Sequence, residues 1–300
     1  MTPGKQADGT RDPALASLIG APCRVLRPAI QKVPFVFASP HSGRLYPPGF
    51  VARSWLSPLA LRRSEDAFVD ELFGCVVDQG APMIAALFPR AYVDVNRAAS
   101  ELDNAMFEAE LGLDVDAPSA RVTAGLGVIP RIVRDGAEIY REKLSPREAE
   151  ERLALLYRPY HTALAELVEE TRARFGMAIV VDCHSMPSAS NLPDIVFGDR
   201  YGASASPSVM HHAEHSFAAC GFTTARNAPY AGGYTTHLYG RREQGVQALQ
   251  IEVNRMLYLH EERIERGPRF AGTQARLARA LEQLLALDTT ALRIRPQAAE

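Results

Sequence analysis

The sequence predicts an α/β fold in which a mixed, mostly parallel sheet is flanked by helices. Short apolar runs alternate along the chain with longer amphipathic stretches, and several of the runs are apolar on both faces, as buried central strands are. Strands that alternate with helices form sheets covered on both sides. With 300 residues, of which 47% are hydrophobic, the chain can bury a large core.

Apolar composition and length predict six strands. These are residues 33–39, 83–88, 92–95, 177–183, 194–197 and 249–253. Helical spacing of apolar residues, together with capping signals, predicts four helices. These are residues 64–79, 145–175, 206–220 and 257 to about 287. Pro159 lies inside the second helix and is a position at which that helix could break.

The two ends of the chain are expected to lie outside the main fold. Residues 1–30 mix glycine, proline and charge and are predicted to form a loose N-terminal arm, and residues 288–300 a C-terminal tail. Residues 31–287 are expected to form a single α/β domain, since no linker divides them. Within it, residues 98–144 are rich in glycine and charge, which predicts an irregular insertion near the functional site.

Composition and charge exclude several classes of partner. Lysine and arginine (33) nearly balance aspartate and glutamate (35), so no global field would recruit nucleic acid or an anionic membrane. The four cysteines are scattered, with no CxxC pair, which favours a reducing, cytoplasmic location. The first residues lack the apolar core of a signal peptide, and no apolar run approaches the roughly 18 residues of a membrane span. A small-molecule substrate fits this balance best.

Three residues suited to metal chemistry stand at the ends of predicted strands. His41, His184 and Glu252 each end or closely follow an apolar run. Because open α/β sheets bind ligands at the carboxyl ends of their strands, these side chains could converge. A catalytic zinc takes about three protein ligands and keeps one position open for water. The third ligand could be Glu65 or Asp66, although acidic residues in a first helical turn also complement the helix dipole.

Seven short motifs, taken together and in this order, resemble those of the N-formylglutamate amidohydrolase family. They are SPHSGRLYP (39–47), SEDAFVDELF (64–73), PRAYVDVNR (89–97), GVIPR (127–131), DCHSMPS (182–188), AGGYTTHLYG (231–240) and QIEVNRMLY (250–258). The resemblance covers about residues 33–258. Its specificity comes from the number and order of the motifs rather than from any one of them.

The resemblance implies a phosphorylase/hydrolase-like fold related to zinc carboxypeptidases, and one catalytic Zn²⁺, for which other divalent metals could substitute. It implies that His41, Asp66 and His184 bind the metal and that Glu252 is the general base. Glu65, beside Asp66, leaves the acidic ligand open. The implied reaction is hydrolysis of N-formyl-L-glutamate to formate and L-glutamate, a step of amino-acid catabolism in histidine degradation. The HxxE spacing of carboxypeptidases is absent after His41, because position 44 is arginine.

A substrate with two carboxylates requires bidentate donors, which arginine provides better than lysine. Arg97, with Asn96 beside it as a further donor, and Arg131 are the first candidates, and Arg255 is a weaker third. For each arginine the alternative is a surface position or a structural ion pair.

The AGGY turn (231–234) has two glycines where the backbone must bend tightly or approach a ligand. Gly233 and Tyr234 are therefore candidate substrate contacts, and His237 could assist the oxyanion or the leaving group. Asp182 could orient a ligand imidazole.

Other interpretations compete with this one. Residues 211–215 (HHAEH) fit the HxxEH pattern of inverted zinc peptidases, but the apolar spacing of their helix leaves the histidines toward solvent. A serine hydrolase would use Ser42 or Ser185, yet the sequence has no GxSxG motif. A metallopeptidase or deacylase for another N-acyl amino acid or small peptide, and a non-catalytic binding protein, are the remaining alternatives.

Overall fold

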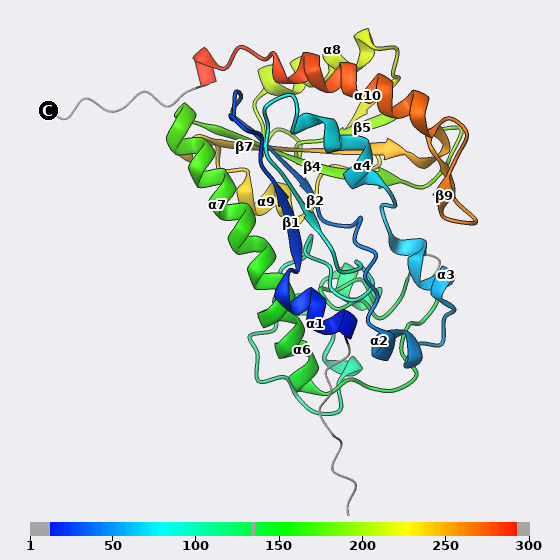
Figure 1. Ribbon diagram of the computed structural model, residues 1–300. Coiled ribbons are helices and arrows are strands. Elements are labelled where there is room, and N and C mark those ends of the chain that lie inside the picture. The colour runs from blue at the N-terminus through cyan, green and yellow to red at the C-terminus, as the bar shows by residue number, and fades with distance from the viewer. Residues whose placement is uncertain (1–12, 134–135, 293–300) are drawn as a thin grey trace, which may run out of the picture.

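The computed structural model describes residues 13–133 and 136–292 and confirms the α/β fold (Figure 1). Its main sheet has the strand order β1-β3-β2-β4-β7-β5-β6. The strands are β1 (Cys23–Leu26), β2 (Phe35–Ser39), β3 (Met83–Ala86), β4 (Ala178–Met186), β5 (Ile195–Gly198), β6 (Thr224–Arg226) and β7 (Val246–Asn254). The central strands β3, β2, β4 and β7 run parallel, whereas β1 and β5 pair antiparallel with the two outer members of this group.

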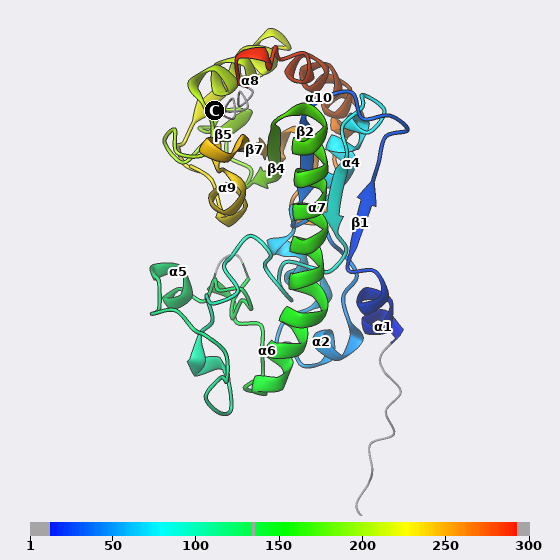
Figure 2. The ribbon, with the colours of Figure 1, turned by 90° about the vertical axis from the view of Figure 1, so that its left-hand side faces the viewer.

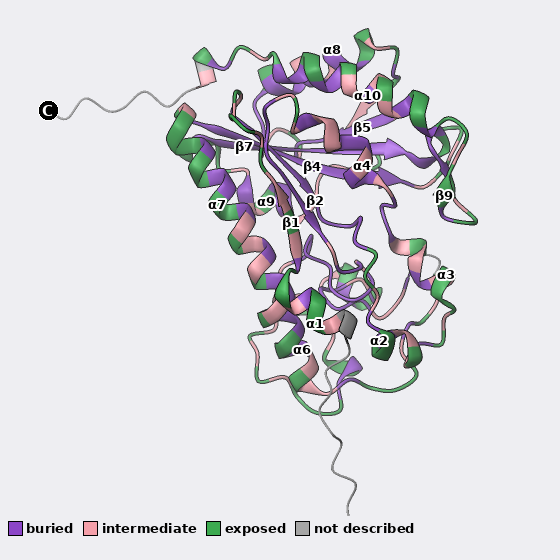
Figure 3. Cartoon of the chain, in the orientation of Figure 1, coloured by how far each residue is buried: buried purple, intermediate pink, exposed green. Residues whose placement is uncertain are grey.

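Helices cover both faces of the sheet (Figures 1 and 2). One face carries α7 (Arg158–Phe175) and α9 (Tyr234–Tyr239), and the other carries α4 (Val69–Phe73), α8 (Pro207–Ala219) and α10 (Phe270–Leu285). Alternate residues of each strand pack against the helices on the two faces, because successive side chains of a strand point to opposite faces. Val180 packs on the α7 side and Ile179 on the α8 and α10 side. The central strands are therefore buried along their length (Figure 3).

The remaining helices and strands are short. They are α1 (Pro13–Gly20), α2 (Pro48–Ala52), α3 (Pro58–Leu61), α5 (Ala120–Thr123), α6 (Pro146–Arg152), β8 (Leu259–His260) and β9 (Glu265–Arg266). The described part of segment 98–144 is irregular, as predicted, and α5 belongs to it. Among the described residues, no helix combines the length and the apolar character needed to cross a bilayer.

Two predicted helices are shorter than expected. Segment 64–79 contains only α4 and short 3-10 turns, because Phe68 adopts a left-handed φ of 63° that interrupts helical hydrogen bonding. The last helix begins at Phe270 rather than at residue 257, because Gly267 and Pro268 separate it from the β8–β9 hairpin. The first of these breaks places Asp66 in a loop instead of a helical turn.

Two further predictions differ from the structure. Pro159 does not break its helix: α6 continues through a π-helical segment, Leu153–Tyr157, into α7, whose first turn contains the proline. The π-helical turn just before it accommodates the proline ring and its missing N–H group. Residues 92–95 do not form a strand, because the N–H groups of Tyr92 and Val93 both donate to the Pro89 carbonyl in a turn.

The expectation of a loose arm is wrong for the described residues 13–30. This segment contains α1 and β1, and β1 pairs with β3 from Cys23 to Leu26. Apolar side chains of this strand, Cys23 and Val25, pack against the core on the α7 side, which explains why the segment joins the fold. Residues 1–12 of the predicted arm and 293–300 of the predicted tail lie outside the described residues.

Candidate metal centre and active site

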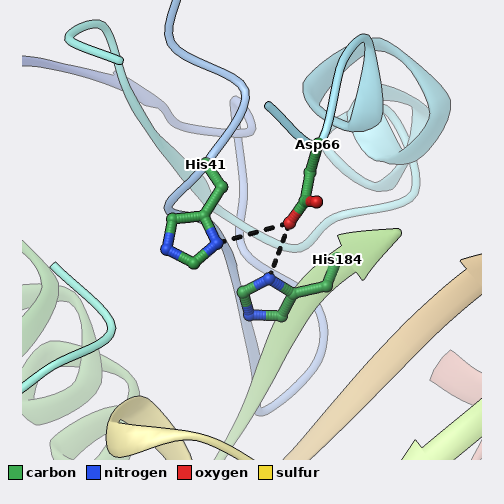
Figure 4. A group of neighbouring side chains, drawn as sticks. All are labelled: His41, Asp66 and His184. Carbon is green, nitrogen blue, oxygen red and sulfur yellow. Dashed lines mark hydrogen bonds and ion pairs between the residues drawn. The ribbon is translucent and has the colours of Figure 1, made fainter. Parts of the chain in front are cut away.

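Three side chains that are distant in sequence converge at the carboxyl ends of β2 and β4 (Figure 4). His41 follows β2 by two residues, and His184 lies near the end of β4. Asp66 comes from the loop before α4, where its backbone N–H donates to the His41 carbonyl at 3.0 Å. The loop that Phe68 creates therefore brings the carboxylate to the two imidazoles.

The potential ligand atoms of this cluster face one another. Asp66 Oδ2 lies 2.8 Å from His184 Nδ1 and 3.3 Å from His41 Nδ1 (Figure 4). No more than 4% of any of the three side chains is exposed. Two imidazoles and one carboxylate are a ligand set that suits zinc and leaves a position open for water.

The other ring nitrogen of each imidazole is held by a carboxylate. Asp94 Oδ1 lies 2.7 Å from His41 Nε2, and Asp182 Oδ2 lies 2.9 Å from His184 Nε2. Because a carboxylate accepts hydrogen bonds, both Nε2 atoms are donors, and each neutral ring then points a lone pair from Nδ1 toward Asp66. His41 Nδ1 is buried without a hydrogen-bond partner. A divalent cation would satisfy these converging acceptors, so the residues fit a metal, and the outer carboxylates would orient its ligands.

Arg255 fixes the orientation of Asp66. Its Nη2 donates to Asp66 Oδ1 at 3.0 Å and to the Glu65 carbonyl at 2.6 Å, and its Nε donates to Ser185 at 3.1 Å. The Glu65 carboxylate points elsewhere, since it accepts hydrogen bonds from Tyr46 and Arg62. The structure thus brings Asp66, and not Glu65, to the histidines.

Glu252 lies beside the cluster on the neighbouring strand. In the β4–β7 pairing its register partner is His184, and Gln250 donates to its Oε1 at 2.7 Å. Burial raises the pKa of Glu252 to about 7, and the Asp66 charge acts in the same direction. A carboxyl group with such a pKa can accept and return a proton near neutral pH.

The charges of the cluster stabilise one another. Burial acts to raise the pKa of Asp66, but its interactions with His184 and His41 outweigh it and hold that pKa well below its usual range. Burial acts to lower the pKa of His184, but the charge and hydrogen bond of Asp182 raise it well above its usual value. The surroundings of His184 therefore favour positive charge, as a cation site requires.

These side chains line a cavity of about 550 Å³. The cavity reaches from the cluster and Glu252 to segment 98–144 and to the turn at Gly233. Its charged lining is rich in arginine and includes Arg63, Arg90, Arg97, Arg121 and Arg255. An anionic ligand is therefore the class of molecule that this cavity suits.

Asn96 is engaged by protein groups at the cavity wall. Its Oδ1 accepts from the Thr235 backbone N–H at 2.7 Å, and its Nδ2 donates to Asp182 at 3.1 Å. Gly233 packs directly on it: a Cβ at position 233 would lie 2.5 Å from Asn96 Nδ2, so only glycine fits there. Asn96 thus ties the AGGY turn to β4.

Besides Glu65, three residues predicted for the site do not line the cavity. Arg131 pairs with Glu138 at 3.1 Å and is 37% exposed. His237 is exposed and its ring contacts the Arg200 guanidinium, while Tyr234 packs edge-on against a histidine outside the cavity. Sequence reasoning, in turn, missed the outer carboxylate Asp94 and the cavity residues Arg90 and Arg121. The signal for Asp94 was its place in the motif PRAYVDVNR, two residues before Asn96.

The competing motifs have other roles. On α8, His211 and His215 are exposed, and Glu214 forms a two-point ion pair with Arg226. Within residues 13–133 and 136–292, the one metal-type group of His, Cys, Asp and Glu side chains is the cluster at β2 and β4. Ser185 supports that cluster through Arg255, and Ser42 hydrogen-bonds with Ser39.

Comparison with known proteins identifies the family of the chain. The family model of N-formylglutamate amidohydrolase matches residues 33–259. The N-formylglutamate deformylase of Pseudomonas aeruginosa is 32% identical over 267 residues, which cover 85% of this chain and 94% of that protein. The N-formylglutamate deformylase of Pseudomonas putida is 27% identical over 239 residues, or 77% of this chain and 83% of that protein.

Solved structures with the same fold include a member of this family. The crystal structure of N-formylglutamate amidohydrolase from Ralstonia eutropha JMP134 superimposes with a TM-score of 0.82 at 36% identity, covering 88% of this chain and 96% of that one. A gene product of Agrobacterium tumefaciens shares the fold, with a TM-score of 0.66 at 18% identity over 90% of this chain and 95% of that one. By the match of its family model and of these relatives, the chain belongs to the N-formylglutamate amidohydrolase family, a family of hydrolases.

Proposed function

We propose that this protein is a zinc-dependent amidohydrolase that converts N-formyl-L-glutamate and water to formate and L-glutamate. The observation that carries the proposal is the convergence of His41 Nδ1, His184 Nδ1 and Asp66 Oδ2, with Glu252 on the adjacent strand. Those three residues would hold the ion. The names of the relatives supply the substrate.

Different residues of the chain would carry out different steps of the hydrolysis. A bound Zn²⁺ would supply a Lewis acid that acidifies water and polarises the formyl carbonyl. Glu252 accepts the proton of the attacking water, which its pKa of about 7 permits. The same carboxyl group then donates that proton to the departing amine, so that the amide bond can break at neutral pH. Asp94 and Asp182 keep the imidazoles in the correct tautomer and orientation.

The cavity supports an acidic substrate. N-formylglutamate carries two carboxylates, and arginine guanidinium groups match carboxylate geometry. Burial lowers the pKa of Arg97, whose partly shielded guanidinium would gain from a bound anion. The four cysteines are unpaired, which supports the reducing, cytoplasmic location that we propose with this reaction in amino-acid catabolism and histidine degradation.

The proposal is tested with purified, zinc-loaded protein and a panel of N-formyl and N-acetyl amino acids. We expect formate and glutamate to be released in equal amounts from N-formyl-L-glutamate, with slower turnover of the other compounds. Glu252→Gln should retain zinc and lose turnover, whereas the control Glu243→Gln, an exposed glutamate, should change neither. Binding of N-formylglutamate without formate release would show a binding protein instead. Faster turnover of an N-acetyl compound would show a different deacylase.

A further inference from the structure

Two arginines of the cavity have no carboxylate within hydrogen-bonding distance in the part of the chain that the structure describes. Of the five that line the cavity, Arg255 contacts Asp66 and Arg90 contacts Asp94 at 3.0 Å. Arg63 also has an interaction within the protein. Arg97 and Arg121 differ from these three, and both belong to the wall formed by segment 98–144 and the residue before it.

Arg97 is held by backbone carbonyls and forms only a long ion pair with Asp94. Its Nε donates to the Leu126 carbonyl at 3.0 Å and its Nη1 donates to the Asn96 carbonyl at 2.7 Å, and only 9% of its side chain is exposed. Its Nη2 lies 4.0 Å from Asp94, whose oxygens already accept from other groups, among them His41 and Arg90. Backbone carbonyls fix a guanidinium without supplying a counter-charge.

Arg121 stands near Arg97, and its charge acts on the Arg97 guanidinium. The Leu126 peptide links the two, because its carbonyl accepts from Arg97 and its N–H donates to the Arg121 carbonyl at 2.8 Å. Within residues 13–133 and 136–292, the Arg121 side chain forms no ion pair or hydrogen bond. Glu101 is also near Arg97, but its oxygens accept from Ala98 N–H and from the Ser119 hydroxyl.

The two neighbouring cations, Arg97 and Arg121, repel each other. Burial lowers the pKa of Arg97, and the Arg90 and Arg121 charges act in the same direction, against the charge of Asp94. A carboxylate placed between the two guanidinium groups would remove this repulsion and would accept charge-assisted hydrogen bonds from both. The Arg97 and Arg121 side of the cavity is therefore suited to binding an anion.

The lining of the cavity indicates which of the two carboxylates of N-formylglutamate would bind between Arg97 and Arg121. The α-carboxylate of an N-formyl amino acid shares a carbon with the scissile nitrogen, so it must lie near the metal ligands. The side-chain carboxylate of glutamate lies farther out, beyond two methylene groups. Apolar side chains suited to methylenes, Leu126, Pro130 and Ile132, line the cavity together with Arg121, which is exposed.

We infer that Arg97 and Arg121 form a subsite that binds the side-chain carboxylate of the substrate and so selects acidic N-formyl amino acids. This inference rests on the proposed function and identifies the residues that would bind the side chain of the substrate. Arg121 is the specificity-determining residue of the pair, because its side chain forms no ion pair or hydrogen bond with the rest of residues 13–133 and 136–292.

The test compares N-formyl-L-glutamate with N-formyl-L-glutamine, its neutral isostere, in three variants. Arg121→Gln should raise KM for N-formylglutamate about 10- to 100-fold with little change in kcat, and should leave kcat/KM for N-formylglutamine nearly unchanged. Arg121→Lys should restore part of the loss, because it keeps the charge. The matched control is Arg131→Gln, which removes an arginine of the same segment that points away from the cavity, and it should behave as wild type. Equal losses for both substrates, or no loss, would overturn the inference.

A binding measurement separates this inference from the proposed function. Calorimetry on the zinc-loaded protein compares L-glutamate with L-glutamine, so it needs no turnover. If wild type releases no formate but prefers glutamate, and Arg121→Gln abolishes that preference, the subsite stands and the proposed reaction fails. If the preference is absent from wild type or survives in Arg121→Gln, the subsite is wrong, whatever the activity.

Discussion

The buried cluster at β2 and β4 and the HHAEH stretch of α8 contain the same residue types in opposite settings. In the cluster, each imidazole is almost fully buried and is held by an outer carboxylate, so that its free nitrogen points at Asp66. On α8, His211 and His215 are exposed, and Glu214 is occupied by Arg226. A spacing of one helical turn brings ligands to one face but does not bury or orient them. Burial and the neighbouring carboxylates, rather than spacing, distinguish the candidate metal site from the α8 histidines.

Replacing the histidines of each region should give the largest difference. His41→Ala combined with His184→Ala removes two of three proposed ligands, and we expect zinc affinity to fall about 1,000-fold or more and formate release to be lost. His211→Ala combined with His215→Ala should preserve both properties. Competition titration with a chelator measures the affinity. Loss of zinc in the α8 variant alone would reverse the assignment.

The arginines of the two regions should differ in their effect on stability. Arg255→Met leaves the buried Asp66 without its arginine partner, and we expect the free energy of unfolding of the metal-free protein to fall by about 3 kcal/mol. Arg226→Met breaks a pair whose side chains are 30% and 27% exposed, and should cost no more than about 1 kcal/mol. Urea denaturation compares the variants. Equal losses would contradict the distinction between a buried and an exposed pair.

Replacing one carboxylate beside each set of histidines should give the smallest of the three differences between the buried cluster and α8. Asp94→Asn keeps the shape of the side chain but weakens its hold on His41 Nε2, and we expect zinc affinity to fall about 10- to 100-fold. Glu214→Gln removes the only carboxylate of the HHAEH stretch and should leave zinc affinity unchanged. The same chelator titration measures both. An unchanged affinity in Asp94→Asn would mean that the outer shell does not orient the ligands.

Local sequence signals predicted the sheet and the strand-end residues well. His41, His184 and Glu252 follow apolar runs that can only be buried strands in this pattern, so their placement at one edge follows from the topology. The choice between Glu65 and Asp66 needed three-dimensional contacts, because Arg255 lies about 190 positions away from both. The break at Phe68 also depends on tertiary packing, and no residue type at that position signals it.

The sequence was much less informative about which arginines line the cavity. Arg121 and Arg131 lie in the same irregular segment, where no periodicity shows which side chain faces inward. Only the fold shows that Arg131 pairs with Glu138 while Arg121 lines the cavity. His237 was chosen because of its motif, and its exposure follows from its position on the outer side of α9, which the motif does not encode.

Anomalous X-ray diffraction from crystals of the zinc-loaded protein, recorded on both sides of the zinc absorption edge, tests the metal site most directly. The structure predicts one strong peak coordinated by Nδ1 of His41, Nδ1 of His184 and Oδ2 of Asp66. A peak on α8, or none between those three atoms, would contradict the proposed centre.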